Sequence, residues 1–226
     1  MSQLYVVATP IGNLEDITQR ALRILGEVDA VACEDTRRTL KLLSRYQLRK
    51  PLVSFHSHNQ ERAAEQILRL LEEGKNVALV SDGGTPGLSD PGGTLVRAAR
   101  ERGHLVVPVP GPSAFAALVS AAGCPSTGLL FAGFLPPKTG KRRKWLAEHL
   151  AWEGGIVLYE SPHRILRLLE ELKELAPQRK LLIGREMTKA HEEFLEGIPE
   201  KLLTELSGRA RMLGEFSVLV MPEKKF

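Results

Sequence analysis

The stretch NVALVSDGGTPGLSDPGG, residues 76–93, decides the predicted fold. Its apolar run at 77–80 is typical of a buried strand, and a glycine-rich loop with Asp82, Thr85 and Asp90 follows at once. Glycines let backbone N–H and C=O groups approach a ligand without interference from a Cβ atom. Because open α/β sheets bind ligands at the carboxyl ends of their strands, this stretch predicts a ligand-binding loop.

Two further loops follow strand-like runs: TPIGN at 9–13 after LYVVA, and PGPSA at 110–114 after HLVVPV. Each loop alone could be an ordinary turn, because Gly and Pro occur in the turns of every globular protein. Three such loops in one small chain predict one shared binding site. None fits GxxxxGK[ST] or a GxGxxG that opens a helix, so neither an ordinary triphosphatase nor a Rossmann dehydrogenase is indicated.

Length and composition place the chain among ordinary soluble enzymes. Its 226 residues allow one large domain or two modest ones, with 43% hydrophobic and 26% charged residues. No apolar run approaches the roughly 20 residues of a membrane span, and the N-terminus lacks the basic region of a signal peptide. Cys33 and Cys124 form no CxxC, so neither a disulfide framework nor structural zinc is expected. A cytoplasmic location is predicted.

The first half of the chain alternates strand and helix patterns, which predicts an α/β fold with a mostly parallel sheet covered by helices on both faces. Asp16 is a candidate N-cap for the first long helix, and Asn59 and Gly74 bracket the clearest one. A further helical pattern ends before Gly103. The expected strands are 4–8, 30–33, 52–56, 77–81 and 105–109.

The second half is less regular, and residues 123–128 are the expected crossing point. The short link between the runs at 181–185 and 193–196 predicts antiparallel pairing. We therefore expect two α/β domains, 1–112 with a mostly parallel sheet and 113–226 with a mixed sheet. The other expected elements of this half are strands at 130–134, 156–159 and 216–221 and helices at 141–150, 162–175 and 199–206.

Five more motifs accompany the three loops: ACEDTR at 32–37, GFLP at 133–136, YESPHR at 159–164, GREMTK at 184–189 and GEFSVLV at 214–220. In this order, and over nearly the whole chain, the set resembles the tetrapyrrole methylase superfamily. Within it, EDTR, FHSHN and YESPHR resemble the branch that methylates small-subunit ribosomal RNA. One departure is Gly83, where the family usually has alanine in SDAGTP.

This resemblance implies a methyltransferase without the Rossmann fold, with S-adenosylmethionine held in a cleft between two α/β domains, and usually a homodimer. The implied reaction is 2′-O-methylation of a cytidine in the decoding region of 16S rRNA, with the small ribosomal subunit as partner and neither DNA nor membrane involved. Carried over by motif, the implied cofactor-binding residues are Pro10, Gly12, Ser81, Asp82, Gly83, Thr85, Gly111, Ser113, Ala114, Tyr159, Glu160 and Glu186.

A ribose hydroxyl is a poor nucleophile, so a general base or acceptor should lie near it. The sequence offers Glu34, Asp35, His56 and Glu160 and does not choose among them. Asp35 could equally form an ion pair that fixes its loop, and His56 could be an ordinary loop histidine. The HxH pattern at 56–58 would place both rings on one face of a strand, which is also metal-ligand geometry, but without a third ligand no metal is expected.

The basic run at 138–144 is the strongest candidate for RNA phosphate contact. It falls in the expected first turn of a helix, where cations oppose the helix dipole, so a purely structural role would favour Asp or Glu. For the charged clusters at 160–164 and 185–189, the alternative is that they are ordinary solvated faces. The candidate RNA-binding residues are Lys138, Lys141, Arg142, Arg143 and Lys144 in this run, with Arg37, Arg164, Arg185 and Lys189 elsewhere.

Two other functions compete with this hypothesis. A methyltransferase acting on a tetrapyrrole precursor would use the same cofactor, and a basic rim would also suit the carboxylates of that substrate. A non-catalytic ribosome-binding module could have kept the fold, although the intact loops argue against it. The set of EDTR, FHSHN and YESPHR motifs favours the RNA substrate.

Overall fold

The computed structural model describes residues 2–123 and 128–222. It divides the chain into two compact units, Met1–Ser113 and Ala114–Phe226, each with one five-stranded sheet. The α/β class expected from the sequence is confirmed. Within the described ranges no helix is long and apolar enough to cross a membrane. Cys33 is buried with a free thiol, whereas Cys124 lies outside the described residues.

The sheet of the N-terminal unit is parallel throughout, in the order β3-β2-β4-β1-β5. Two of its three inner strands, β2 and β4, are fully buried, as expected for parallel strands between two helix layers. Pro108 lies in β5 at the edge of the sheet, where a missing N–H donor is tolerated. The strands are β1 (Gln3–Val7), β2 (Ala30–Cys33), β3 (Leu52–Ser54), β4 (Val77–Val80) and β5 (Leu105–Val109).

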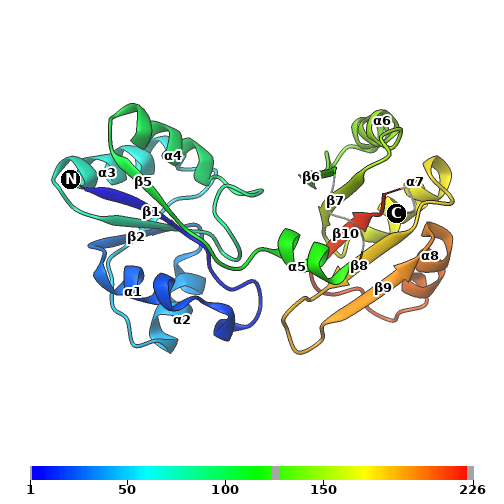
Figure 1. Cartoon of the computed structure of the whole chain (residues 1–226), viewed down its shortest axis with the longest axis horizontal. Helices are drawn as coiled ribbons and strands as arrows, with labels where there is room; N and C mark the ends of the chain where they lie inside the picture. The colour runs from blue at the N-terminus through cyan, green and yellow to red at the C-terminus, as the bar shows by residue number, and fades with distance from the viewer. Residues whose placement is uncertain (1, 124–127, 223–226) are drawn as a thin grey trace. The chain divides into compact units, whose positions relative to one another are not determined.

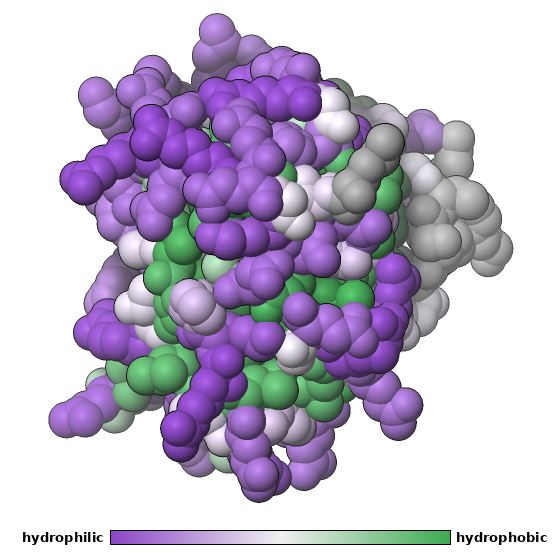
Figure 2. All heavy atoms as spheres, turned by 90° about the vertical axis from the view of Figure 1, so that its left-hand side faces the viewer, coloured by the Kyte–Doolittle hydropathy of each residue, from purple (hydrophilic) through white to green (hydrophobic). Residues whose placement is uncertain are grey.

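Helices cover both faces of this sheet (Figure 1). Alternate residues of β4 pack on opposite sides: Ala78 and Val80 join the core under α1 and α2, and Val77 and Leu79 join the core under α3 and α4. Figure 2 shows the face of the molecule on the side of this unit, where hydrophilic side chains dominate and apolar atoms show between them over the middle and lower parts. The helices are α1 (Gln19–Glu27), α2 (Thr36–Arg45), α3 (Gln60–Glu72) and α4 (Gly92–Glu101).

The start of α1 differs from the prediction. Leu14–Asp16 forms a short 3-10 helix, and the hydroxyl oxygen of Thr18 accepts from the backbone N–H of Ala21 at 3.0 Å. The prediction of Asp16 as N-cap is therefore wrong, because Thr18 has the extended backbone and the capping hydrogen bond.

The boundaries of α3 follow the sequence signals. Asn59 is its N-cap residue, although the Asn59 side chain bonds to the preceding loop instead of the helix. Gly74 lies just beyond the C-cap with φ of +84°, the left-handed conformation that glycine adopts without a steric penalty. Gly103, with φ of +78°, ends α4 in the same way.

The sheet of the C-terminal unit is mixed, in the order β6-β7-β10-β8-β9. β6 and β7 are parallel, whereas the β7–β10, β10–β8 and β8–β9 pairs are antiparallel. The expected antiparallel pairing of the strands near 181 and 193 is confirmed. The strands are β6 (Leu129–Phe134), β7 (Gly155–Glu160), β8 (Leu181–Arg185), β9 (Glu193–Gly197) and β10 (Phe216–Val220).

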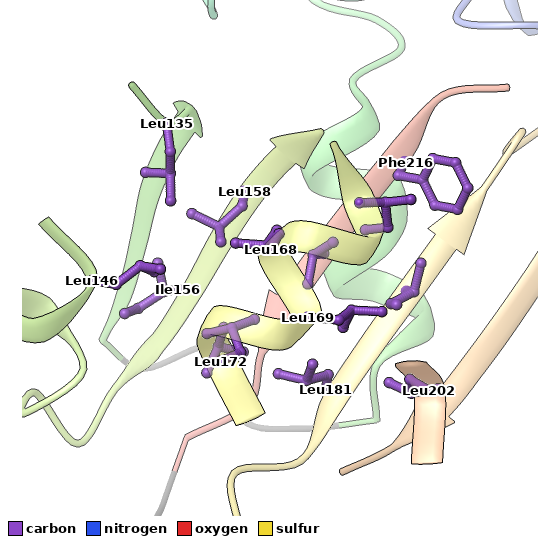
Figure 3. Close-up of a cluster of buried hydrophobic side chains, with 14 of the residues drawn as sticks. Leu135, Leu146, Ile156, Leu158, Leu168, Leu169, Leu172, Leu181, Leu202 and Phe216 are labelled. Atoms are coloured by element: carbon purple, nitrogen blue, oxygen red, sulfur yellow. The ribbon is translucent and has the colours of Figure 1, made fainter. Parts of the chain in front are cut away.

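Three helices, α6 (Thr139–His149), α7 (Ile165–Leu175) and α8 (Pro199–Ser207), build the main core of this unit. In Figure 3, Leu168 and Leu172 of α7 point toward the side chains of the sheet. The apolar stripe of α7 repeats at three- and four-residue intervals, which buries one side of the helix and leaves the other exposed.

The helix α5 (Ala114–Ala121) was not predicted from the sequence. Its sequence, AFAALVSA, is apolar on almost every side. It therefore lacks the alternation of apolar and polar faces by which an amphipathic helix is predicted. It lies against β8 and β10, and its buried residue is Leu118. The predicted crossing point falls largely on residues 124–127, outside the described residues.

Candidate functional site

The three glycine-containing loops lie together in the N-terminal unit, at the carboxyl ends of β1, β4 and β5. Thr9 and Gly84 exchange two backbone hydrogen bonds of 2.9 Å each, and the hydroxyl of Thr9 donates to the carbonyl of Ser81 at 3.1 Å. The hydroxyl of Thr85 donates to the carbonyl of Pro112 at 3.2 Å. The three loops therefore form one hydrogen-bonded surface.

Two glycines of these loops occupy positions that a side chain would disturb. Gly84 has φ of +93°, a conformation that L-residues rarely adopt. A Cβ atom at Gly111 would lie 3.0 Å from the Cβ atom of Ala8. At Gly83 a Cβ atom would lie 3.3 Å from the carbonyl oxygen of Pro10, so the alanine usual in the family needs only a small local shift.

Asp82 connects the glycine-rich loop to the end of β2. Its Oδ1 accepts from the backbone N–H of Asp35 at 2.9 Å, and its Oδ2 lies 3.7 Å from Nε of Arg38. The carboxylate of Asp35 caps α2 and pairs with the guanidinium of Arg37 at 2.7 Å. The hydrogen bonds from Arg37 lower the pKa of Asp35 to about 2. Asp35 is thus ionised and its carboxylate is engaged by Arg37, which favours the loop-fixing role over that of a general base.

Glu34 differs from its neighbour Asp35. It is half-buried, and this burial, followed by repulsion from Asp82 and Asp90, raises the pKa of Glu34, while Arg38 and His56 act in the opposite direction. A carboxylate with a raised pKa accepts a proton more readily near neutral pH. Glu34 is therefore the best suited of the acidic candidates in this unit to act as a base.

His56 and His58 do not lie on a strand, because β3 ends at Ser54. The HxH geometry predicted from the sequence is therefore wrong. Nδ1 of His56 accepts from the backbone N–H of His58 at 3.2 Å, and the backbone N–H of His56 donates to the side chain of Asn59 at 2.8 Å. In the part of the chain that the structure describes, no three His, Cys, Asp or Glu side chains gather as a metal site.

Glu160 ends β7 in the C-terminal unit with only 2% of its surface exposed. Its Oε1 accepts from the backbone N–H of Ser161 at 2.8 Å and lies 3.1 Å from Nε of Arg164. Burial raises the pKa of Glu160, although Ser161, Arg164 and Arg142 partly offset the effect. The fold therefore favours the protonated form of this carboxyl group.

We expect this burial to appear as a pH dependence of stability. Because the folded-state pKa of Glu160 is raised, its contribution to stability is full below the unfolded pKa, near 4.5, and is lost as the pH rises through the folded pKa. The free energy of unfolding of the wild-type protein, relative to Glu160→Gln, should fall as the pH rises above about 4.5. Urea unfolding at several pH values measures this difference. A difference that grows with pH would contradict the assignment.

Four aromatic side chains gather in the C-terminal unit although only 5% of the chain is aromatic. Phe115 and Phe131 meet edge to face at 5.3 Å between ring centroids, and Phe131 and Tyr159 at 5.1 Å. Phe134 contacts Tyr159 at 5.8 Å and is 57% exposed. Burial raises the pKa of Tyr159, so its hydroxyl is protonated at neutral pH. This cluster could not be predicted from the sequence, because its members come from the separate elements α5, β6 and β7.

The profile of the family described as "Tetrapyrrole (Corrin/Porphyrin) Methylases" matches residues 3–202. The chain belongs to the tetrapyrrole methylase family. The family expected from the motifs is thereby confirmed, and with it the assignment of the chain as a methyltransferase.

Relatives named "Ribosomal RNA small subunit methyltransferase I" match almost the whole of this tetrapyrrole methylase. The relative from Coprothermobacter proteolyticus is 46% identical over 98% of this chain and 99% of its own length. The relative from Thermotoga maritima is 46% identical over 97% of this chain and 98% of its own length. That from Neisseria meningitidis serogroup B is 47% identical over 96% of this chain and 75% of its own length.

Solved structures of tetrapyrrole methylases share the fold at lower identity. The methyltransferase CobJ is 20% identical with a TM-score of 0.74, covering 100% of this chain and 97% of that one. Uroporphyrin-III C-methyl transferase from Thermus thermophilus, complexed with S-adenyl homocysteine, is 21% identical with a TM-score of 0.68, covering 96% and 97%. These likenesses confirm the predicted non-Rossmann methyltransferase fold.

Arg142, predicted from the sequence to contact RNA, is instead buried in this tetrapyrrole methylase. Only 1% of its surface is exposed, and its guanidinium donates to both carboxylate oxygens of Glu171, at 2.6 and 2.8 Å. The prediction for Arg142 is wrong, because its side chain points from α6 into the core, where Glu171 of α7 satisfies it.

Most of the other predicted RNA contacts also have acidic partners within the fold. Arg143 pairs with Glu174 at 2.6 Å, and Lys144 lies 3.9 Å from Glu148. Arg164 is half-buried beside Glu160, and its guanidinium donates a hydrogen bond of 2.9 Å to the carbonyl oxygen of Leu135. Lys138 and Lys141 are exposed and have no ion pair within the described ranges. The run is thus a weaker RNA surface than its composition suggests.

The GREMTK segment is a tight junction within the C-terminal unit. Arg185 donates to the carbonyl of Leu213 at 2.8 Å. Oε1 of Glu186 accepts from Nζ of Lys189 at 2.8 Å and from the backbone N–H of Glu215 at 3.0 Å. Burial raises the pKa of Glu186, but Lys189 and the Glu215 N–H outweigh it, so the net shift is downward. These contacts favour a structural role for Arg185, Glu186 and Lys189.

Proposed function

We propose that this chain transfers a methyl group from S-adenosylmethionine to the ribose 2′-oxygen of a cytidine in the decoding region of 16S rRNA. The observation that carries this proposal is the identity of 46–47%, over 96–98% of the chain, with relatives named for methylation of small-subunit ribosomal RNA. The EDTR, FHSHN and YESPHR motifs support the choice of a ribose hydroxyl as acceptor.

The joined loops of the N-terminal unit suit this cofactor. S-adenosylmethionine carries a sulfonium cation and ribose hydroxyls, which backbone carbonyls and carboxylates can bind. The left-handed turn at Gly84 holds the loop against Thr9 through two backbone hydrogen bonds, and Asp82 contributes a carboxylate to the same loop. When bound, the cofactor supplies an activated methyl group. The residues of this unit proposed to hold it are Pro10, Gly12, Ser81, Asp82, Gly83, Thr85, Gly111 and Ser113.

We assign the role of proton acceptor to Glu34. Bound S-adenosylmethionine would supply the methyl group to the ribose oxygen, and Glu34 would take up the hydroxyl proton. Glu34 follows β2 directly and has a raised pKa. Asp35, by contrast, is paired with Arg37, and Nδ1 of His56 accepts a hydrogen bond from the backbone N–H of His58. The main contribution of the protein is to position both reactants and exclude water, because the methyl donor is already activated.

We further propose that the chain acts as a homodimer in the cytoplasm, with the small ribosomal subunit as its partner. The names of the relatives, which specify small-subunit ribosomal RNA, support the choice of this partner. Neither DNA nor a membrane is needed for the proposed reaction.

The alternative function is methylation of a tetrapyrrole precursor, which the likeness to uroporphyrin-III C-methyl transferase favours. That likeness rests on 21% identity, against 46% for the rRNA methyltransferases. The third possibility, a non-catalytic ribosome-binding module, has no observation in its favour, because the glycine loops are intact and joined.

The deciding experiment supplies radiolabelled S-adenosylmethionine with three substrates in parallel: small ribosomal subunits lacking the methylation, free 16S rRNA, and uroporphyrinogen III. We expect label on rRNA, mapped to a ribose by resistance of the linkage to alkali. Label on the macrocycle alone would establish the alternative. Cofactor binding without label on any substrate would indicate the non-catalytic module.

A further inference from the structure

Residues 36–60 contain six Lys and Arg residues and no Asp or Glu. Four of the six lie on α2, where Arg37, Lys41 and Arg45 follow one another at four-residue intervals and Arg38 lies one residue further round. Because an α-helix has 3.6 residues per turn, the four occupy one side of α2. All four are exposed. We call them the basic face of α2: Arg37, Arg38, Lys41 and Arg45.

Half of this face has no acidic partner among the residues that the structure describes. Arg37 forms an ion pair with the carboxylate of Asp35, and Nε of Arg38 lies 3.7 Å from Oδ2 of Asp82. Lys41 and Arg45 have no ion pair with any residue that the structure describes. In the run at 138–144, Arg142 is buried against Glu171, and Arg143 and Lys144 have acidic neighbours in their own unit.

Helix stability does not account for the basic face. A cation near the C-terminus of a helix is favourable, which would explain Arg45. Arg37 and Arg38 lie in the first turn, where a positive charge opposes the helix dipole. The N-cap Asp35 supplies an acid at this end and pairs with Arg37, but the helix dipole itself gives neither cation of the first turn any benefit.

We propose that the basic face of α2 binds the phosphate backbone of the rRNA substrate, an inference that rests on the proposed function. The helix begins beside the proposed cofactor loop, since the backbone N–H of Asp35 is bound by Asp82. At 1.5 Å of rise per residue, Arg45 lies about 12 Å along the axis from Arg37. One strand of a duplex carries a phosphate about every 3.4 Å along the axis, so the face spans several phosphates of one strand. It thus holds the strand that leads away from the target ribose.

The test compares two double charge reversals. Lys41→Glu/Arg45→Glu removes half of the basic face, and Arg97→Glu/Arg100→Glu is the matched control on α4. Lys41 and Arg97 are both the sixth residue of a ten-residue helix, and Arg45 and Arg100 both lie in a last turn, all exposed. Both variants change the net charge equally. Lys41→Gln/Arg45→Gln serves as a milder second variant if the reversal impairs folding.

Binding is measured to small ribosomal subunits lacking the methylation, over a range of salt concentrations, with calorimetric titration of S-adenosylmethionine alongside. We expect the α2 variant to bind subunits about tenfold or more weakly, with a shallower salt dependence, and to keep its cofactor affinity. The control should match the wild-type protein. If both variants bind subunits equally well, or lose affinity equally, the basic face of α2 is not the RNA contact. Methylation of rRNA by the wild-type protein would still support the proposed function in that case. A wild-type protein that neither binds nor methylates rRNA overturns the proposed function itself.

Discussion

Replacing Asp82 with alanine is expected to weaken the affinity for S-adenosylmethionine by about ten- to a hundredfold. The carboxylate accepts from the backbone N–H of Asp35 at 2.9 Å, so its loss frees the end of β2 from the glycine-rich loop. It also removes a negative charge beside the proposed site of a cationic cofactor. Isothermal titration calorimetry measures the affinity directly.

Two further variants separate the causes. Asp82→Asn keeps an oxygen that can accept from Asp35 but removes the charge, so an intermediate affinity would assign part of the effect to each. Asp16→Ala removes an exposed carboxylate from the same unit and should leave the affinity unchanged. An Asp82→Ala protein that folds and binds the cofactor as tightly as the wild type would remove Asp82 from the site.

Much of the N-terminal unit could be predicted because each element carries its own period. β2 and β5 begin and end where the sequence places them, since short apolar runs between turn residues are typical of buried strands. The position of the glycine loops follows from the same argument, because parallel strands bring their carboxyl ends to one edge of the sheet. The hydrogen bonds between Thr9 and Gly84, which join two of the loops across 75 positions, could not be predicted.

The candidate site was harder to predict where a side chain has a choice of partner. Glu34 and Asp35 are neighbours of the same chemistry, yet burial raises the pKa of one and Arg37 lowers that of the other to about 2. That difference depends on which way each side chain turns at the end of β2. The basic face of α2 did have a sequence signal, the absence of acids over 36–60, which the more compact run at 138–144 obscured.

Arg142 shows how composition can mislead about a surface. In sequence it stands among four other basic residues, but it also stands four residues before Leu146 and eight before Leu150, both buried. This spacing places all three on one side of α6. Its partner Glu171 lies 29 positions away in a stretch of charged residues, so the sequence could not show that the two meet.

The Arg142→Met variant is expected to lose about 3–5 kcal/mol in its free energy of unfolding, because it leaves the buried carboxylate of Glu171 without its partner. Urea unfolding measures the loss. Arg143→Met is the matched control on the same helix: its pair with Glu174 is exposed, so the cost should be at most about 1 kcal/mol.

The double variant Arg142→Met/Glu171→Leu distinguishes a costly unpaired charge from a pair that is itself strongly stabilising. Apolar side chains of similar size remove both desolvation penalties, so the double variant should unfold with a free energy equal to the wild type or about 1–4 kcal/mol higher. If it is as unstable as Arg142→Met, the pair contributes more than the core packing that replaces it. If its affinity for small ribosomal subunits also falls tenfold while Arg143→Met binds normally, Arg142 contacts RNA after all, and its buried position is not the one used with substrate.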